Sequence, residues 1–149
     1  MEAPIRGPRA PLLNMRFRVE IEGLPESGVV EVVFPEARLV RGRNGGSVRY
    51  GTLILRRGIA RSSDWYDWWN EARRARKAPS RSIAVTLLDE TGASAQQWVF
   101  SKATPLAYAL SNLNALGQEA LIETLELTVG GFEAATDSAP SPRRKRGVR

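Results

Sequence analysis

The sequence contains no cysteine and no histidine. Without cysteine, the chain has no disulfide framework and no thiol nucleophile. Without either residue it lacks the usual zinc ligands, and it has no histidine base for a catalytic triad or dyad. We therefore predict no catalytic residue, no metal and no cofactor. Paired carboxylates remain the one enzymatic chemistry to consider.

Long apolar runs are also missing. No stretch approaches the roughly 20 apolar residues of a membrane-spanning helix. Residues 1–13 lack the apolar segment of a secretory signal, so we expect synthesis and assembly in the cytoplasm. A length of 149 residues fits one domain.

Positive charge is concentrated at the C-terminus. Residues 138–149 contain five cations and no acid, which leaves a net charge of only +1 for residues 1–137; the five are Arg143, Arg144, Lys145, Arg146 and Arg149. We expect residues 134–149 to form a disordered basic tail, because small residues, prolines and arginines bury little apolar surface. The prolines in residues 1–14 predict an extended arm, so the folded domain should span residues 15–133.

Alternating hydrophobic residues predict a mainly β fold. Between residues 15 and 23, Phe17, Val19 and Ile21 share one face of a strand. Further strands are expected at 29–34, 37–41, 48–57, 82–88, 96–102 and 119–129, with loops at 41–47 and 105–118 and a hairpin turn at 89–92. About six or seven strands and one helix predict a β-sandwich or small barrel with the helix packed outside.

Residues 64–78 are predicted to form this helix. Asp64 is a good N-cap residue, and Pro79 cannot continue the helix. Four residues with i, i+3, i+4, i+7 spacing form an apolar stripe: Trp65, Trp68, Trp69 and Ala72. This spacing favours packing of the helix against the sheet over a binding platform for sugars or bases.

A basic strip lies between Ala37 and Ser63, a stretch that contains seven arginines and no acidic residue. It consists of Arg38, Arg41, Arg43, Arg49, Arg56, Arg57 and Arg61. Three interpretations remain open: contact with an acidic partner subunit, a solvated face, or binding of nucleic-acid phosphates. Only Tyr50 is available there to stack on bases, which weighs against nucleic acid.

Glu123 occupies the apolar face of a predicted strand, between Leu121 and Leu125. A buried carboxylate is costly unless it is paired with a cation. We therefore predict a charge-assisted bond from an arginine, within the subunit or across an interface, and we favour Arg57. Structural pairing is a better explanation of this glutamate than catalysis.

An ordered series of short motifs runs through residues 11–131. Its pieces are Pro11 with Phe17-x-Val19-x-Ile21-x-Gly23; Leu53-x-Leu55-Arg56-Arg57-Gly58; Trp65-x-x-Trp68-Trp69; Ile83-x-Val85-x-Leu87-Leu88-Asp89-Glu90-x-Gly92; Trp98-x-Phe100-x-x-Ala103-x-Pro105; and Leu113-Asn114-Ala115 before Ile122-Glu123-x-Leu125-x-Leu127. In this series the chain resembles the tail tube proteins of contractile phages, a family shared with extracellular contractile injection systems.

The resemblance implies a homohexameric ring that stacks into a hollow tube. Strands of the six subunits would join into one continuous inner barrel, with the helix outside. The tube would be part of a phage tail or an extracellular injection particle. Its partners would be further copies of the chain, a surrounding sheath, baseplate and terminator proteins at the ends, and DNA or protein cargo in the lumen.

Two features depart from the family pattern. The second predicted strand continues as VVFPEARLV in place of a turn resembling Ser-Gly-Leu, and the basic tail is an addition. They leave open a tube-initiating ring protein at the baseplate. A small basic nucleic-acid-binding module is the second functional class, and a carboxylate enzyme is the third.

Overall fold

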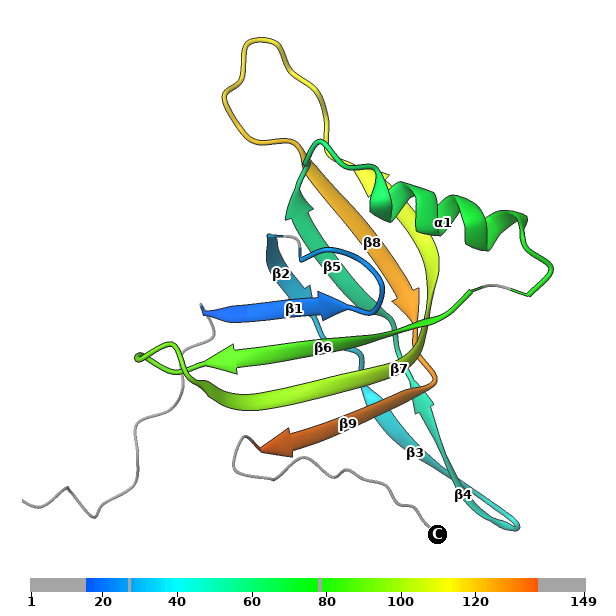
Figure 1. Ribbon diagram of the computed structural model, residues 1–149. Helices are drawn as coiled ribbons and strands as arrows, with labels where there is room; N and C mark the ends of the chain where they lie inside the picture. Colours follow the sequence, from blue (N-terminus) through cyan, green and yellow to red (C-terminus); the bar gives the residue numbers. More distant parts are fainter. Residues whose placement is uncertain (1–15, 27, 78, 137–149) are drawn as a thin grey trace, which may run out of the picture.

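The computed structural model describes residues 16–26, 28–77 and 79–136, which form nine strands and one helix (Figure 1). The elements are β1 (Phe17–Ile21), β2 (Val29–Val33), β3 (Ala37–Gly42), β4 (Gly45–Tyr50), β5 (Leu53–Gly58), α1 (Asp64–Arg74), β6 (Arg81–Leu88), β7 (Ser94–Leu110), β8 (Ile122–Thr128) and β9 (Gly131–Thr136). The predicted mainly β class with one outer helix is confirmed. The cations of the predicted basic tail and the predicted N-terminal arm lie outside the described residues.

The long strand β7 belongs to two antiparallel sheets. Its first half lies between β6 and β9, and β6 also pairs with β1; we call these strands sheet A. Its second half pairs with β8, which is followed by β5 and β2; we call these strands sheet B. Lys102, at the change from one sheet to the other, has a left-handed backbone with φ of 54°. Strands that switch sheets at such a bend form the corners of packed sheets.

The core lies between the two sheets and the helix. Alternate residues of β5 and β8 point into it, including Leu53, Leu55, Leu125 and Leu127, all fully buried. Sheet A contributes the buried Ile83, Val85 and Phe100. Helix α1 packs against β7. The spacing of its apolar stripe explains why it presents one face to this core.

Strands β3 and β4 form a separate hairpin that extends away from the sheets (Figure 1). The predicted loop at 41–47 is wrong, because the pairing continues to Gly42 and Gly45 at the tip. Gly45 has φ of 107°, a conformation that glycine adopts at little cost and that permits the tight turn. At the base, Phe34 contacts the rings of Trp98, Phe100 and Phe132 and so ties the end of β2 to sheet A.

Other boundaries also differ from prediction. The predicted strand at 48–57 is interrupted at Gly51 and Thr52, between β4 and β5. Helix α1 ends at Arg74 and not at residue 78, because Ala75 is already extended. Strand β7 runs to Leu110, through the first part of the predicted loop at 105–118. The sequence does not predict strand β9, whose residues 134–136 fall within the predicted tail. Within the described residues, no helix has the length and hydrophobicity needed to cross a membrane.

Candidate functional site: a buried arginine network and open assembly surfaces

Arg57 joins three elements in the core. It faces inward from β5, opposite Glu123 of β8 in the strand register. Its Nε donates to Glu123 Oε1 at 2.7 Å, and one terminal nitrogen donates to Asp64 Oδ1, at the start of α1, at 2.6 Å. The exposed fractions of Arg57 and Glu123 are 2% and 1%. The structure thus brings Arg57 and Glu123 together inside one subunit, and Asp64 is a second acidic partner.

Tyr108 extends this network to β7. Its hydroxyl donates to Glu123 Oε2 at 2.5 Å, and its ring lies against Tyr66 and Trp69 of α1. Burial and the hydrogen bond to Glu123 raise the pKa of Tyr108 above its ordinary value. We call Arg57, Asp64, Tyr108 and Glu123 the arginine network. It links β5, β7, β8 and α1.

Asp64 has a different role from the predicted N-cap. The N-cap residue is Ser63, which makes no capping hydrogen bond with its side chain. The Asp64 carboxylate accepts from the Trp65 backbone N–H at 2.9 Å as well as from Arg57. The positive end of the helix dipole also favours a carboxylate in this position. Sequence reasoning missed Asp64 and Tyr108 as members of the network, since only their neighbours in space reveal the role.

The tryptophan stripe lies on the sheet side of α1. Trp65 and Trp68 are buried, whereas Trp69 and Ala72 are half-buried. The Arg57 guanidinium carbon lies 4.1 Å from the centre of the Trp65 ring. Trp68 Nε1 donates to the Pro79 carbonyl oxygen at 3.3 Å. These contacts fix the helix to the sheets.

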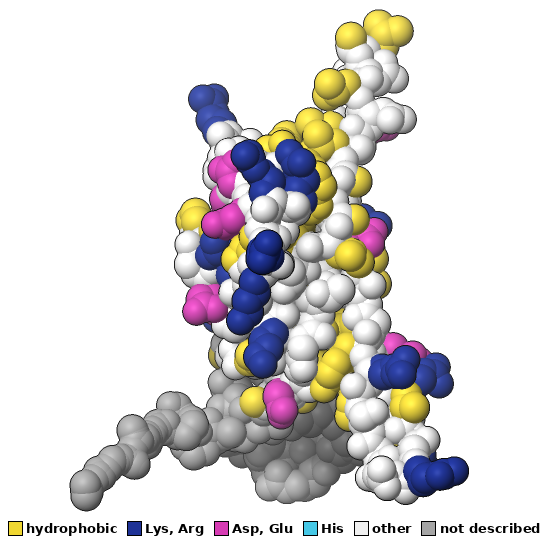
Figure 2. All heavy atoms as spheres, turned by 90° about the vertical axis from the view of Figure 1, so that its right-hand side faces the viewer, with side chains coloured by type: hydrophobic (Ala, Val, Ile, Leu, Met, Phe, Trp, Pro, Cys, Tyr) yellow, Lys and Arg dark blue, Asp and Glu magenta, His cyan; other side chains and the backbone are white. Residues whose placement is uncertain are grey.

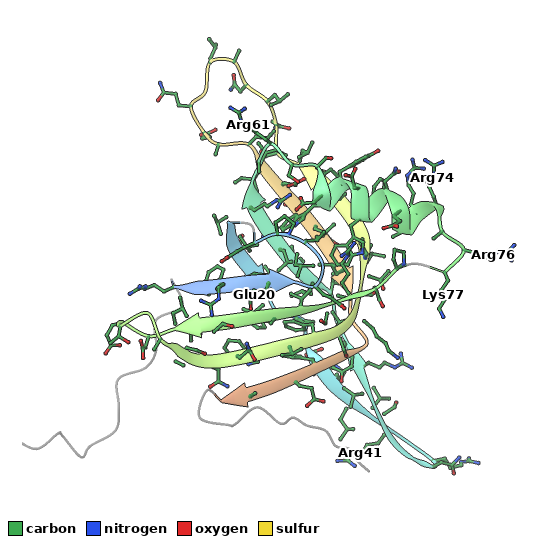
Figure 3. All side chains as sticks on the ribbon, in the orientation of Figure 1. Glu20, Arg41, Arg61, Arg74, Arg76 and Lys77 are labelled. Carbon is green, nitrogen blue, oxygen red and sulfur yellow. The ribbon has the colours of Figure 1, made fainter. Side chains whose placement is uncertain are left out.

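The basic strip does not form one surface. Arg57 is in the core, Arg56 pairs with Glu31 at 2.8 Å, and Arg38 pairs with Glu36 at 2.9 Å. Figure 3 shows Arg41 on the hairpin and Arg61 at the opposite end of the molecule. The remaining two, Arg43 and Arg49, are exposed on the hairpin. This dispersal provides no continuous track for a phosphate backbone.

The outer face of α1 is polar. A shallow depression there is lined by Asp67, Asn70, Glu71, Arg74 and Ala75. Arg74, Arg76 and Lys77 project from the C-terminal end of the helix and from the residues that follow it (Figure 3). The described residues include no cluster of three or more acidic side chains that would hold a metal ion.

Sheet B has two open edges. In the described part of the chain, β2 pairs only with β5, and the second half of β7 pairs only with β8. Both edges expose apolar side chains: Val30 is 62% exposed on β2, and Leu106 is 55% exposed on β7. Open edges with apolar side chains favour the addition of a strand from another chain.

Two further apolar features project from the molecule. The loop of residues 111–121 carries Leu113 and Leu116, which are 84% and 95% exposed. The hairpin carries Leu39 and Val48, which are 54% and 50% exposed. Figure 1 places the loop and the hairpin at opposite ends of the molecule, and Figure 2 shows hydrophobic side chains at the tip of the loop. The sequence predicted neither exposure.

Residues 13–133 match the family model described as T4-like virus tail tube protein gp19. No curated protein matches the sequence.

Several solved structures share the fold. One is an extracellular contractile injection system, the PVC sheath–tube complex in the extended state (TM-score 0.67, 17% identity, 85% of this chain and 92% of that chain). Another is the anti-feeding prophage (AFP) baseplate, 6-fold symmetrised (TM-score 0.65, 20% identity, covering 88% of this chain and 99% of that chain). A third is Hcp1 from Flavobacterium johnsoniae (TM-score 0.61, 15% identity, covering 80% of this chain and 94% of that chain).

Proposed function

Because this chain belongs to the family of T4-like virus tail tube proteins, we propose that its copies form hexameric rings, which stack into the inner tube of a contractile tail or injection system. The role is mechanical, and no catalytic step is assigned to it. The number six follows the similar baseplate structure that is 6-fold symmetrised.

The observation that carries this proposal is the pair of open edges on sheet B. The order of its strands is β7, β8, β5 and β2, and each is antiparallel to the next. Strands β7 and β2 therefore run in opposite directions. When the β2 edge of one copy meets the β7 edge of the next, the new pair is again antiparallel, and repetition of this contact closes a ring.

The covered face of sheet B fixes its orientation in such a ring. Sheet A and α1 pack on the face that carries Leu55 and Leu125, so the opposite face is the one free to line a lumen. This free face carries Ile54, Arg56, Thr124 and Glu126, which alternate with the core residues of β5 and β8. Helix α1 then lies on the outside of the ring.

The partners follow from the same arrangement. A sheath protein would surround the tube, as in the similar PVC sheath–tube complex. Baseplate and terminator proteins would meet its two ends, and DNA or an effector protein would pass through the lumen. The similarity to a baseplate structure also supports a second candidate role, the ring that initiates the tube.

Native mass spectrometry and negative-stain microscopy of the full chain test the proposal. We expect six-subunit rings. Replacing the exposed Val30 by lysine puts a charge on the β2 edge, so Val30→Lys should raise the protein concentration needed for rings at least tenfold, roughly 1.4 kcal/mol per ring contact.

Glu20→Lys is the matched control, because it adds positive charge to an exposed position of β1 in sheet A, away from the proposed contact. It should leave the rings unchanged. A wild-type chain that stays monomeric over a wide range of concentration and salt would refute the proposed function.

A further inference from the structure

The two projecting features leave opposite ends of sheet B. The loop of residues 111–121 connects the end of β7 to the start of β8. The β3–β4 hairpin lies between the end of β2 and the start of β5. Since the four strands alternate in direction, these two connections are at opposite ends of the strands, as Figure 1 shows. In a ring walled by sheet B, they project from opposite rims.

The loop is shaped to present its leucines outward. The Asn114 side-chain oxygen accepts from the Leu116 N–H at 3.0 Å, and its carbonyl oxygen accepts from the Gly117 N–H at 3.0 Å. At the base, Ser111 and Ile122 exchange two hydrogen bonds of 2.8 and 2.9 Å. The loop is therefore a defined structure in which Leu113 and Leu116 have no cover within the described residues. Its one charged residue is Glu119.

The hairpin carries an exposed apolar pair on one face, with Arg41 two residues farther along the same face. Leu39 and Val48 are direct cross-strand partners, so their side chains lie on the same face. Arg38 and Arg49 are partners on the other face. At Gly46, a Cβ atom would lie 3.0 Å from Leu39 Cδ1, so the absence of a side chain leaves room for this leucine. Residues 37–50 hold four arginines and no acid, which gives this end positive charge (Figure 2).

We infer that these two features bind each other between stacked rings. The loop of one copy lies on the face with Leu39 and Val48 in the hairpin of a second copy, in the next ring. Leu113 and Leu116 cover Leu39 and Val48, and Glu119 meets the positive end of the hairpin. Burial of exposed apolar surface drives the contact, and opposite charge orients it.

Such a contact joins opposite rims of two copies, so each repeat moves one ring along the tube axis and does not close on itself. Repetition gives an open stack, which is the geometry of a tube. Each pair of rings would form six equivalent contacts, and individually weak contacts would add through avidity. This inference rests on the proposed ring, but it concerns a different surface from the β2–β7 contact that closes the ring.

Two double variants test the inference by microscopy and analytical ultracentrifugation. Leu113→Ser with Leu116→Ser removes the apolar loop surface, and Leu39→Ser with Val48→Ser removes the hairpin surface. Each should form single rings and lose stacking. The matched loop control, Asn112→Ser with Gln118→Ser, changes two other exposed residues and should stack as the wild type does.

Mixing the two double variants provides the sharpest test. Rings with a defective loop still have an intact hairpin, and rings with a defective hairpin still have an intact loop. The mixture should therefore yield pairs of rings but no longer stacks, because only one combination of rims binds.

Stacking of either double variant at wild-type length, or a mixture without paired rings, would overturn the inference while leaving ring formation intact. A wild-type chain without rings would instead overturn the proposed function, and this inference with it.

Discussion

Arg56 and Arg57 are neighbours in the sequence but point to opposite faces of β5. Arg57 lies in the core between the carboxylates of Asp64 and Glu123. The Arg56 side chain is 36% exposed and, among the described residues, pairs only with Glu31. Arg57→Met leaves the buried Glu123 and the partly buried Asp64 without a cation. We expect this change to lower the free energy of unfolding by about 3–5 kcal/mol, as measured by urea denaturation.

Arg56→Met is the control for this measurement, since it removes an arginine and one ion pair from the exposed face of the same strand. The loss should be about 0–1 kcal/mol, because water screens surface pairs. Equal losses for the two variants would show that the arginine network does not depend on burial.

Tyr108 makes stability sensitive to alkaline pH. The folded state holds its phenol neutral, and its pKa is raised from the ordinary value of 10.0. Above pH 10 the unfolded chain therefore releases this proton more readily than the folded chain, so the free energy of unfolding falls as pH rises. Tyr108→Phe should remove that part of the alkaline loss, measured by urea denaturation between pH 7 and about 11.

The same variant should cost about 1.5–3 kcal/mol at neutral pH through the lost hydrogen bond to a carboxylate. Tyr66→Phe serves as the control, because Tyr66 also contacts the Tyr108 ring but is 39% exposed. If the free energy of unfolding of Tyr108→Phe falls with rising pH as much as that of the wild type, Tyr108 is not the source of the alkaline sensitivity.

At the scale of elements, α1 depends on its tryptophans for attachment to the sheets. Trp68 is 1% exposed and packs in the core, so Trp68→Ala leaves a large cavity. We expect a loss of about 3–5 kcal/mol, seen as a lower melting temperature. Tyr66→Ala removes an aromatic ring from the exposed side of the helix and should cost clearly less. A folded Trp68→Ala protein with unchanged melting would contradict this packing.

Regular patterns made several elements predictable. Alternation of Phe17, Val19 and Ile21 predicts β1, and helical spacing of the tryptophans predicts the buried side of α1. The expected proximity of Arg57 and Glu123 came from the cost of an unpaired buried carboxylate. The ion pair of Asp64 is harder to predict. An aspartate at this position is already explained by the start of a helix, so the sequence gives no sign of a second role.

Other elements depend on neighbours that the sequence does not display. The second half of β7 contains Pro105, which lacks an N–H, and several alanines, which have low strand propensity. It forms because β8 pairs with it, and the register shift between Pro105 and Ala107 accommodates the proline. Strand β9 likewise has no alternating pattern of large apolar residues. It forms on the free side of β7.

At the scale of the whole molecule, the sequence alone does not separate apolar residues that form the core from those that form contacts between copies. Leu125 and Leu116 are the same residue type, but one is fully buried and the other is 95% exposed. Only the fold shows that the exposed leucines and the open edges lie on different surfaces of one subunit. The family resemblance predicts that copies of the chain assemble, and the structure identifies the surfaces available for contacts between them.

The sharing of β7 between two sheets also determines when the chain can fold. Sheet B brings together Arg57 and Glu123, which are 66 positions apart, and both sheets need β7 before they are complete. During synthesis, β2 and β5 leave the ribosome well before β7 and β8 are available. Closing the long loop between β5 and β8 before their contacts form makes folding slow, on the order of milliseconds to seconds for β-rich domains. Assembly must wait for nearly the whole described chain.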